Sequence, residues 1–445
     1  MDRRHFSRTL GTTLGALALF PEALSSSFPG TWRRFGEQPL INGPRLHEWL
    51  RQLSRFGRRA DGGVDRVAFS DADIQGREFF RSLMEETGLE VRVDLVGNLI
   101  GRLRGSDPNL PPLMMGSHLD SVPAGGNYDG PLGTLGALEG ARTLQDAGVV
   151  PRHPVDVVAF VNEEGGKTGS RVLAGEFRKE ELQLVSSSGF SIGEGIRRLG
   201  GDPDRLDEAR LERGSMAGFL ELHVEQGAIL EGKGVPIGVV EGIVGIRRWT
   251  AVVNGAANHA GTTPMDQRRD AMIGAAQLVE AVNRVVTSIP GSQVATVGRI
   301  QASPGAPNVI PGEVRMSIEI RALEMDRIQE VMDGIQIEAE AIGYKNGTPI
   351  DMDEFYLSRG APTDIRFRGW VEAAAGELGL DHQRMPSGAG HDAQAVAHFA
   401  PMGMVFIPSV GGLSHHPDEY SRPEDIEAGA NVLLGALLKA DEALD

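Results

Sequence analysis

Three short apolar runs, each followed at once by a polar loop, constrain the fold of this chain more than any other feature. The runs span 113–115, 155–161 and 402–407, and the loops after them carry His118, the pair Glu163 and Glu164, and the pair His415 and His416. Runs of this length and composition are typical of buried parallel strands. Ligands bind beyond the carboxyl ends of strands in open α/β sheets. The pattern therefore predicts an α/β fold with a site at one sheet edge.

A fourth predicted strand, Phe219–Glu225, alternates apolar and polar residues. Leu220, Leu222 and Val224 alternate with Glu221, His223 and Glu225. A period of two is typical of a strand with one polar face, so His223 should share that face with two carboxylates.

The middle of the chain has a different pattern, which predicts an inserted α+β unit. Strand-like runs at 248–253, 293–300 and 313–321 alternate with predicted helices at 264–286 and 325–342. We therefore expect a β-α-β-β-α domain at residues 243–352, between two parts of the sheet domain at 38–242 and 353–445.

The first 27 residues resemble a twin-arginine export signal. Arg3 and Arg4 precede an apolar stretch, Leu10–Phe20, which is too short to span a membrane, and small residues follow it. We expect the mature protein to be exported, for example to the periplasm, and free of the membrane; a cytoplasmic location is the alternative.

The amino-acid composition limits the ligands and the metal sites that this chain can have. The 445 residues include 44 Lys and Arg against 61 Asp and Glu, so the formal net charge is −17, and no Cys is present. An acidic chain without a basic run lacks the charge that nucleic acid binding needs. The absence of Cys excludes disulfides, thiolate nucleophiles and Cys-bound zinc. A metal site would use His, Asp and Glu, which suit Zn²⁺, Mn²⁺ or Co²⁺.

Seven ordered motifs resemble one family. They are GSHLDSVPAGGNYDGPLG (116–133), NEEG (162–165), HVEQG (223–227), GAANHAGTTPMDQRRDA (255–271), NVIPGEVRMSIEIR (308–321), SGAGHDAQ (387–394) and GGLSHHPDE (411–419). Together they resemble the amidase/hydantoinase/carbamoylase branch of the two-metal aminoacylase-like hydrolases. This branch includes N-carbamoyl-L-amino-acid hydrolases, allantoate and ureidoglycolate amidohydrolases and β-ureidopropionases.

The resemblance implies a helix-flanked, mixed-sheet catalytic domain with two divalent metal ions, most simply zinc, with manganese, cobalt or nickel as alternatives. The implied ligands are His118 and His223 for one ion, Glu164 and His415 for the other, and Asp129 as the bridge. His415 is preferred over His416 because it follows Gly-Leu-Ser, as the family's ligand does.

The same resemblance implies the catalytic and substrate-binding residues. Glu163 would be the general base, and the carboxylate of Asp120 would receive the second N–H of the His118 ring. The implied substrate contacts are Gln226, His259, Asn308, Arg321 and Gly390. Arg321 would pair with a substrate carboxylate, and His259 would stabilise the oxyanion from a partner subunit. The inserted domain would then be both a lid and the contact surface of a homodimer.

The expected reaction is cleavage of a C–N bond in a linear amide or urea such as an N-carbamoyl-L-amino acid. Allantoate or ureidoglycolate hydrolysis would use the same mechanism, and dipeptidase or aminoacylase activity is a further alternative, as is a binding protein without catalysis. The stretch Gly165–Thr168 departs from the Ser-Arg-Phe-like sequence of many relatives. We therefore expect a different pocket wall beside Glu163.

A serine hydrolase is a competing interpretation, because Gly189–Gly193 matches the G-x-S-x-G pattern. Glu194 follows Ser191 by three residues, which instead predicts that Ser191 caps a helix.

Overall fold

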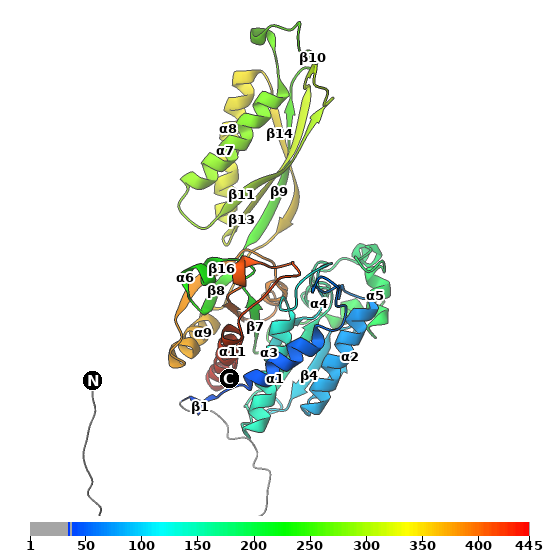
Figure 1. Ribbon diagram of the computed structural model, residues 1–445, viewed down its shortest axis with the longest axis vertical. Helices are drawn as coiled ribbons and strands as arrows, with labels where there is room; N and C mark the ends of the chain where they lie inside the picture. The colour runs from blue at the N-terminus through cyan, green and yellow to red at the C-terminus, as the bar shows by residue number, and fades with distance from the viewer. Residues whose placement is uncertain (1–33, 36–37, 445) are drawn as a thin grey trace, which may run out of the picture.

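The computed structural model describes residues 34–35 and 38–444, which form two bodies joined at a narrow waist (Figure 1). The larger body contains both ends of the described chain, and the smaller body is inserted between them. The predicted export signal at residues 1–27 lies outside the described residues. Within the described part of the chain, no helix has both the length and the apolar character that a membrane span needs.

A nine-stranded mixed sheet is the centre of the larger body, as the sequence predicts for the fold class. Its order is β15-β8-β17-β7-β5-β6-β4-β3, and β16 also pairs with β8. The strands are β3 (Glu90–Val93), β4 (Leu99–Leu103), β5 (Leu113–His118), β6 (Val155–Phe160), β7 (Gly218–Val224), β8 (Ile237–Ile243), β15 (Ala361–Pro362), β16 (His382–Ser387) and β17 (Met402–Ile407).

Four neighbouring strands, β17, β7, β5 and β6, run parallel to one another. They correspond to the apolar runs of the sequence, and every residue in them is buried. Strand β7 is buried on its polar face as well, so that Glu221 and His223 lie inside the protein instead of facing water. The four carboxyl ends therefore meet at one edge of the sheet.

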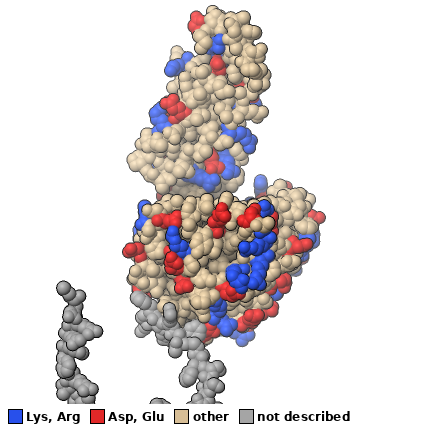
Figure 2. Space-filling view, viewed as in Figure 1, with Lys and Arg blue, Asp and Glu red and all other residues tan. Residues whose placement is uncertain are grey.

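Helices cover both faces of this sheet (Figure 1). One apolar cluster joins the sheet to α1 (Gly43–Leu53), α2 (Asp71–Glu86), α3 (Pro131–Asp146), α9 (Ile365–Glu377) and α11 (Pro423–Ala443). A second cluster includes buried residues of α5 (Ile192–Arg198) and of two short helices, α4 (Thr168–Leu173) and α10 (Asp392–Val396). On the face drawn in Figure 2, basic and acidic side chains are interspersed over both bodies.

The inserted body is a four-stranded antiparallel sheet of order β11-β13-β9-β14, with two helices on one face. The elements are β9 (Gly245–Asn254), α7 (Ala271–Ser288), β11 (Val294–Ser303), β13 (Glu313–Ala322), α8 (Met325–Asn346) and β14 (Ile350–Ser358). A small ladder of β10 (Asn258–His259) and β12 (Val309–Ile310) lies at the tip farthest from the larger body (Figure 1).

The expected boundary of the inserted domain at residue 352 needs correction, because it falls inside β14. This strand pairs with β9 as far as Ser358, so the sheet has four strands instead of three. Strand β14 lies at an edge and carries Asp351, Asp353 and Glu354, most of its residues being exposed. Its alternation of apolar and acidic residues starts at Ile350 but is broken after Glu354, where the pairing with β9 is irregular.

The start of α3 packs unusually close to the sheet at Gly133. A Cβ atom on Gly133 would lie 2.2 Å from the carbonyl oxygen of Leu222 and 2.8 Å from Cβ of Ser117. The absence of a side chain therefore allows α3 to approach β5 and β7, the strands that carry His118 and His223. Asp129 lies two residues before this helix, so its position depends on the same contact.

We expect Gly133→Ala to lower the free energy of unfolding by about 1–3 kcal/mol, as overpacking does, because backbone must move. Gly140→Ala in the same helix is the matched control, since its Cβ would make only ordinary contacts at 3.7 and 3.9 Å. The control should be neutral or stabilise by roughly 0.5–1 kcal/mol, the usual advantage of Ala over Gly in a helix. Denaturant unfolding measures both; equal effects would contradict the packing argument.

Candidate metal centre

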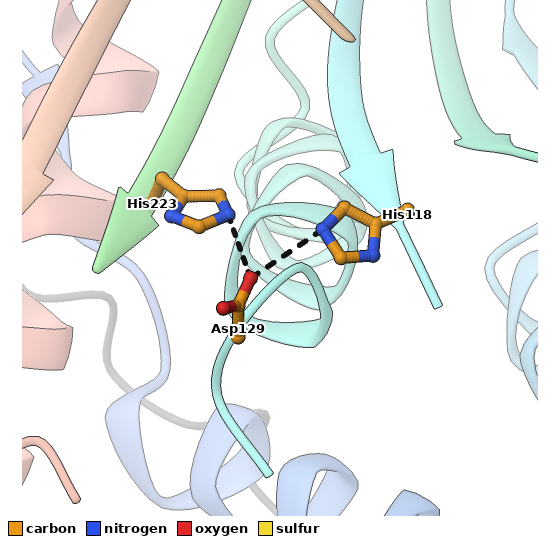
Figure 3. A group of neighbouring side chains, drawn as sticks. All are labelled: His118, Asp129 and His223. Atoms are coloured by element: carbon orange, nitrogen blue, oxygen red, sulfur yellow. Dashed lines mark ion pairs between the residues drawn. The ribbon is translucent and has the colours of Figure 1, made fainter. Parts of the chain in front are cut away.

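Asp129 lies between two histidines at the carboxyl ends of β5 and β7. Its Oδ1 atom is 3.5 Å from Nε2 of His118 and 3.2 Å from Nε2 of His223. Figure 3 shows both rings directed at this carboxylate from neighbouring strands. All three side chains are buried, and their ligand atoms lie close enough to hold one metal ion.

The other oxygen of Asp129 faces a second group of possible ligands. Nε2 of His415 is 3.2 Å from Oδ2 of Asp129 and 3.5 Å from Oε2 of Glu164. These three side chains could also hold a metal ion. The structure thus brings the five expected ligands together, with Asp129 shared between the two groups.

Hydrogen bonds orient the two buried imidazoles. Nδ1 of His118 lies 2.9 Å from the backbone oxygen of Asp120, and Nδ1 of His223 lies 2.8 Å from the backbone oxygen of Val224. Because a carbonyl oxygen only accepts, both Nδ1 atoms carry the proton and both Nε2 lone pairs point toward Asp129. This is the tautomer that metal ligation requires.

The expected role of the Asp120 carboxylate therefore needs correction. Its nearest oxygen is 3.9 Å from Nδ1 of His118, too far for a hydrogen bond, and the backbone carbonyl takes that place. The carboxylate instead accepts the backbone N–H groups of Glu163 at 3.3 Å and Glu164 at 3.2 Å. Asp120 thus helps to position the glutamate pair.

Burial and crowding raise the pKa of both glutamates. Burial raises the pKa of Glu163 to about 7, although the charges of His118 and Lys167 oppose the rise. Burial and the negative charges of Asp129 and Glu163 raise the pKa of Glu164 to about 8. The hydrogen bonds and charges of His118 and His223 outweigh burial at Asp129 and hold its pKa well below the usual value.

The carboxylates around them raise the pKa values of two of the histidines. Although burial disfavours the imidazolium of His223, the adjacent carboxylate of Asp129 raises its pKa to about 9. The hydrogen bond of His415 to Asp129 is the main reason that its pKa also rises to about 9. The carboxylates thus favour positive charge at this edge of the sheet.

A divalent cation fits this donor set. Nε2 of His223 is buried without a hydrogen-bond partner among the described residues, and its lone pair faces a carboxylate oxygen. Two acceptors facing each other in a buried site repel unless a cation or proton lies between them. Imidazoles and carboxylates without thiolates are typical of Zn²⁺ and Mn²⁺ sites.

Three residues beyond the expected ligands hold Asp129 in place. Oε1 of Glu419 accepts the backbone N–H of Asp129 at 3.0 Å, and the hydroxyl of Ser414 donates to Oδ2 of Asp129 at 2.9 Å. Gln226, expected to contact substrate, donates to the same oxygen at 2.6 Å. Glu419 and Ser414 belong to the GGLSHHPDE motif, yet nothing in that motif indicates a partner almost 300 residues away.

The remaining expected substrate contacts divide into two groups. Arg321 and Gly390 lie near the waist, since Nη1 of Arg321 donates to the backbone oxygen of Gly388 at 2.7 Å. His259 and Asn308 lie together at the far tip, where Asn308 accepts the backbone N–H of Ala260 at 3.0 Å. The length of the inserted body separates this pair from the metal centre of its own chain (Figure 1).

The competing serine-hydrolase interpretation does not fit the geometry of Ser191. This residue is the N-cap of α5: its hydroxyl donates to Oε2 of Glu194 at 2.7 Å and accepts the backbone N–H of Glu194. The helix cap predicted from the sequence is confirmed.

Comparison with known proteins identifies the family to which the chain belongs. Residues 114–439 match the peptidase family M20/M25/M40. The chain is 38% identical to N-carbamoyl-L-amino acid amidohydrolase of Geobacillus stearothermophilus, over 88% of this chain and 97% of that one. It is 37% identical to ureidoglycolate hydrolase of Arabidopsis thaliana, over 90% of this chain and 87% of that one.

Comparison with a solved structure indicates the same family. The amidase of the hydantoinase/carbamoylase family from Burkholderia multivorans has a TM-score of 0.83 and 36% identity, covering 90% of this chain and 98% of that one. The chain therefore belongs to the peptidase family M20/M25/M40, which is metal-dependent. The predicted family resemblance is confirmed. So is the predicted class of enzyme, an amidohydrolase that cleaves C–N bonds of linear amides.

We expect the affinity of the metal-free protein for a divalent cation to rise between about pH 6 and pH 9. Ligation requires the loss of protons from Glu164, whose pKa is about 8, and from His223 and His415, whose pKa values are about 9. Calorimetry in buffers of different ionisation enthalpy measures both the affinity and the protons released. His416→Ala is the control, because His416 is exposed and should leave the profile unchanged. A pH-independent affinity would be inconsistent with these ligands.

Proposed function

We propose that this protein is an N-carbamoyl-L-amino-acid amidohydrolase with two divalent metal ions per subunit, zinc in preference to manganese, cobalt or nickel. The observation that carries the proposal is the shared Asp129, whose two oxygens face two separate sets of ligands beside Glu163. A ureidoglycolate hydrolase is the second candidate, because the relative from Arabidopsis thaliana matches nearly as well.

One ion would be held by His118, His223 and Asp129, and the other by Asp129, Glu164 and His415. Divalent metal held by these residues would polarise the amide carbonyl and acidify water. Glu163 then takes a proton from the attacking water and passes it to the leaving nitrogen. Glu163 suits both transfers, because its carboxylate lies beside both ligand groups without belonging to either.

The substrate carboxylate would bind Arg321 at the waist. Arg321 is held by Glu319, which accepts from its Nε at 2.8 Å, and by the backbone oxygen of Gly388. A guanidinium fixed in this way is preorganised for a planar carboxylate. The proposed substrate is therefore a small amide or urea that carries a carboxylate.

A substrate panel tests the proposal directly. The metal-loaded protein is assayed for release of ammonia and free amino acid from N-carbamoyl-L-amino acids, ureidoglycolate, allantoate and dipeptides. Preferred release of both products from N-carbamoyl-L-amino acids is expected. Preference for ureidoglycolate would select the second candidate, and cleavage of dipeptides alone would refute both.

We expect Glu163→Gln to retain metal while turnover falls by roughly 10²–10⁴, the usual contribution of a general base. Oε2 of Glu163 is 3.9 Å from Nε2 of His118, so the side chain reaches the centre without belonging to either ligand group. Glu164→Gln is the comparison, because loss of a ligand should lower metal content as well. Atomic absorption and steady-state kinetics measure the two effects. Near-normal turnover of Glu163→Gln would exclude Glu163 as the base.

We also propose a homodimer in which His259 acts in the partner's site. Nδ1 of His259 accepts the backbone N–H groups of Gly261 at 3.0 Å and Thr262 at 3.2 Å. The ring proton of the neutral form is therefore on Nε2, which is free to donate to a developing oxyanion. The distance of the tip from its own centre in Figure 1 favours a partner's site.

The inserted body offers a surface for this dimer. Strand β11 lies at an edge of its sheet and exposes Val294 and Ile300, and the neighbouring helix α7 exposes Met272 and Ile273. An unpaired edge beside exposed aliphatic side chains suits pairing with a second copy of the chain.

Mixing two inactive variants tests the shared site. His259→Ala should fold, dimerise and bind metal but turn over about 10²–10³ more slowly, the usual effect of losing one oxyanion donor. In a heterodimer with Glu163→Gln, a shared arrangement places both lesions in one site and neither in the other. Activity should then rise toward half of wild type per dimer after subunits exchange. No recovery, with exchange confirmed by mass spectrometry, would mean that His259 serves its own chain.

Export by the twin-arginine route remains a proposal supported by Arg3, Arg4 and the short apolar stretch after them. We expect replacement of both arginines by lysine to leave the protein folded and active in the cytoplasm. Fractionation of cells that express the two forms measures this. Unchanged recovery from the periplasm would remove the twin-arginine proposal, and a cytoplasmic location of the wild type would remove export.

A further inference from the structure

Lys167 lies within the candidate site, although no role has yet been given to it. It follows the glutamate pair in the stretch Gly165–Thr168, where the sequence departs from many relatives. The backbone N–H of Lys167 donates to the backbone oxygen of Glu163 at 2.8 Å, so the residue closes a tight turn around the general base. Its φ of 57° is left-handed, a conformation that is costly for a residue with a side chain.

The ammonium group of Lys167 is directed toward the loop that follows β16. Its Nζ would lie 3.0 Å from a Cβ atom on Gly390, so glycine at that position leaves room for the amine. The next residue, His391, stacks edge-on against His223 with ring centroids 4.4 Å apart. Nζ of Lys167 thus lies against the loop whose His391 packs on the candidate ligand His223, and its charge acts on Glu163.

Gln394 fixes the amine there. Nε2 of Gln394 donates to the backbone oxygen of Arg359 at 2.7 Å, so its Oε1 is directed the other way and accepts from Lys167 at 2.5 Å. An ammonium has three N–H donors, and this bond uses one. In the part of the chain that the structure describes, no carboxylate lies within 4.0 Å of Nζ.

The positively charged side chains of Arg321 and Lys167, which come from different domains, therefore both lie at the short loop 388–390. Arg321, from the inserted body, donates to Gly388, and Lys167, from the catalytic body, faces Gly390. Gly388 and Gly390 are two positions apart, so their Cα atoms are at most about 7 Å apart, and both cations are held at this short loop. Arg321 alone is sufficient for one carboxylate, so the second cation is available for another acidic group.

We propose that Lys167 is a specificity-determining residue that binds a second acidic group, so that the preferred substrates are linear amides or ureas of acidic amino acids. This inference rests on the proposed amidohydrolase function. One carboxylate pairs with Arg321, and the side-chain carboxylate pairs with Lys167. A substrate with a neutral amide in place of the side-chain carboxylate would leave the ammonium of Lys167 without a charged partner.

The test compares N-carbamoyl-L-glutamate with N-carbamoyl-L-glutamine, which differ only in that second group. We expect the metal-loaded wild type to favour the glutamate derivative. Lys167→Gln should lower kcat/KM for this substrate by roughly 10- to 100-fold, mainly through KM, which is the range for one charge-assisted hydrogen bond. The glutamine derivative should change less than threefold. Lys167→Arg should restore much of the preference.

Lys179→Gln is the matched control, because it removes one positive charge from an exposed ion pair with Asp207. It should leave both substrates unaffected. An equal loss on both substrates in Lys167→Gln, carried by kcat, would overturn the proposal, because Lys167 would then act through Glu163. A wild type without any preference between the two substrates would also overturn it.

Binding of the products separates this proposal from the proposed function. Calorimetry on the metal-loaded protein compares L-glutamate with L-glutamine, which requires no turnover. Tighter binding of L-glutamate that is lost in Lys167→Gln supports the role of Lys167 even if neither carbamoyl substrate is hydrolysed, in which case only the proposed function fails. An equal affinity of the wild type for both products overturns the role of Lys167.

Discussion

The candidate site depends on the negative charge of one buried carboxylate, Asp129. Three histidines lie within 3.5 Å of its oxygens, and Glu419 and Ser414 fix it through hydrogen bonds. A buried carboxylate surrounded by imidazoles needs a compensating positive charge, because an unpaired charge in the interior is costly. The close approach of α3 to the sheet at Gly133 keeps the loop that carries Asp129 in position. The position of Asp129 thus depends both on the packing of α3 and on the charges around its carboxylate.

Much of the larger body could be predicted from the sequence, because fully buried strands give unbroken apolar runs. The predicted run 402–407 coincides with β17, and 155–161 extends only one residue beyond β6. The bounds of the elements in the inserted body are harder to predict than those of the buried strands, because some of its elements are exposed or begin irregularly. Helix α7 begins at Ala271 instead of Pro264, because a 3-10 turn follows the proline and Asp270 caps the helix. Strand β14 was not predicted because its alternation of apolar and acidic residues is short and is broken at an irregularity after Glu354.

The candidate ligands could be predicted because strand ends and motifs carry them, whereas their supporting contacts could not. The family resemblance implies a bond between the side chains of His118 and Asp120. The backbone carbonyl makes that bond instead, a choice that depends on local dihedral angles. Glu419 and Lys167 lie in or next to predicted motifs, but their partners Asp129 and Gln394 are more than 200 residues away. Such pairs are defined only by the folded chain.

Both bodies contribute groups to the proposed recognition and catalysis. The catalytic body holds the candidate metal ligands and Glu163 on buried strands and short loops, where little movement is possible. The inserted body presents Arg321 at the waist and His259 at its tip, separated by the length of a ten-residue strand. A shift between the bodies would move Arg321 relative to Lys167 without disturbing the ligands of Asp129. Under the proposed roles of Arg321 and Lys167, substrate length and charge would be selected at the waist, while the geometry of the candidate metal centre stays constant.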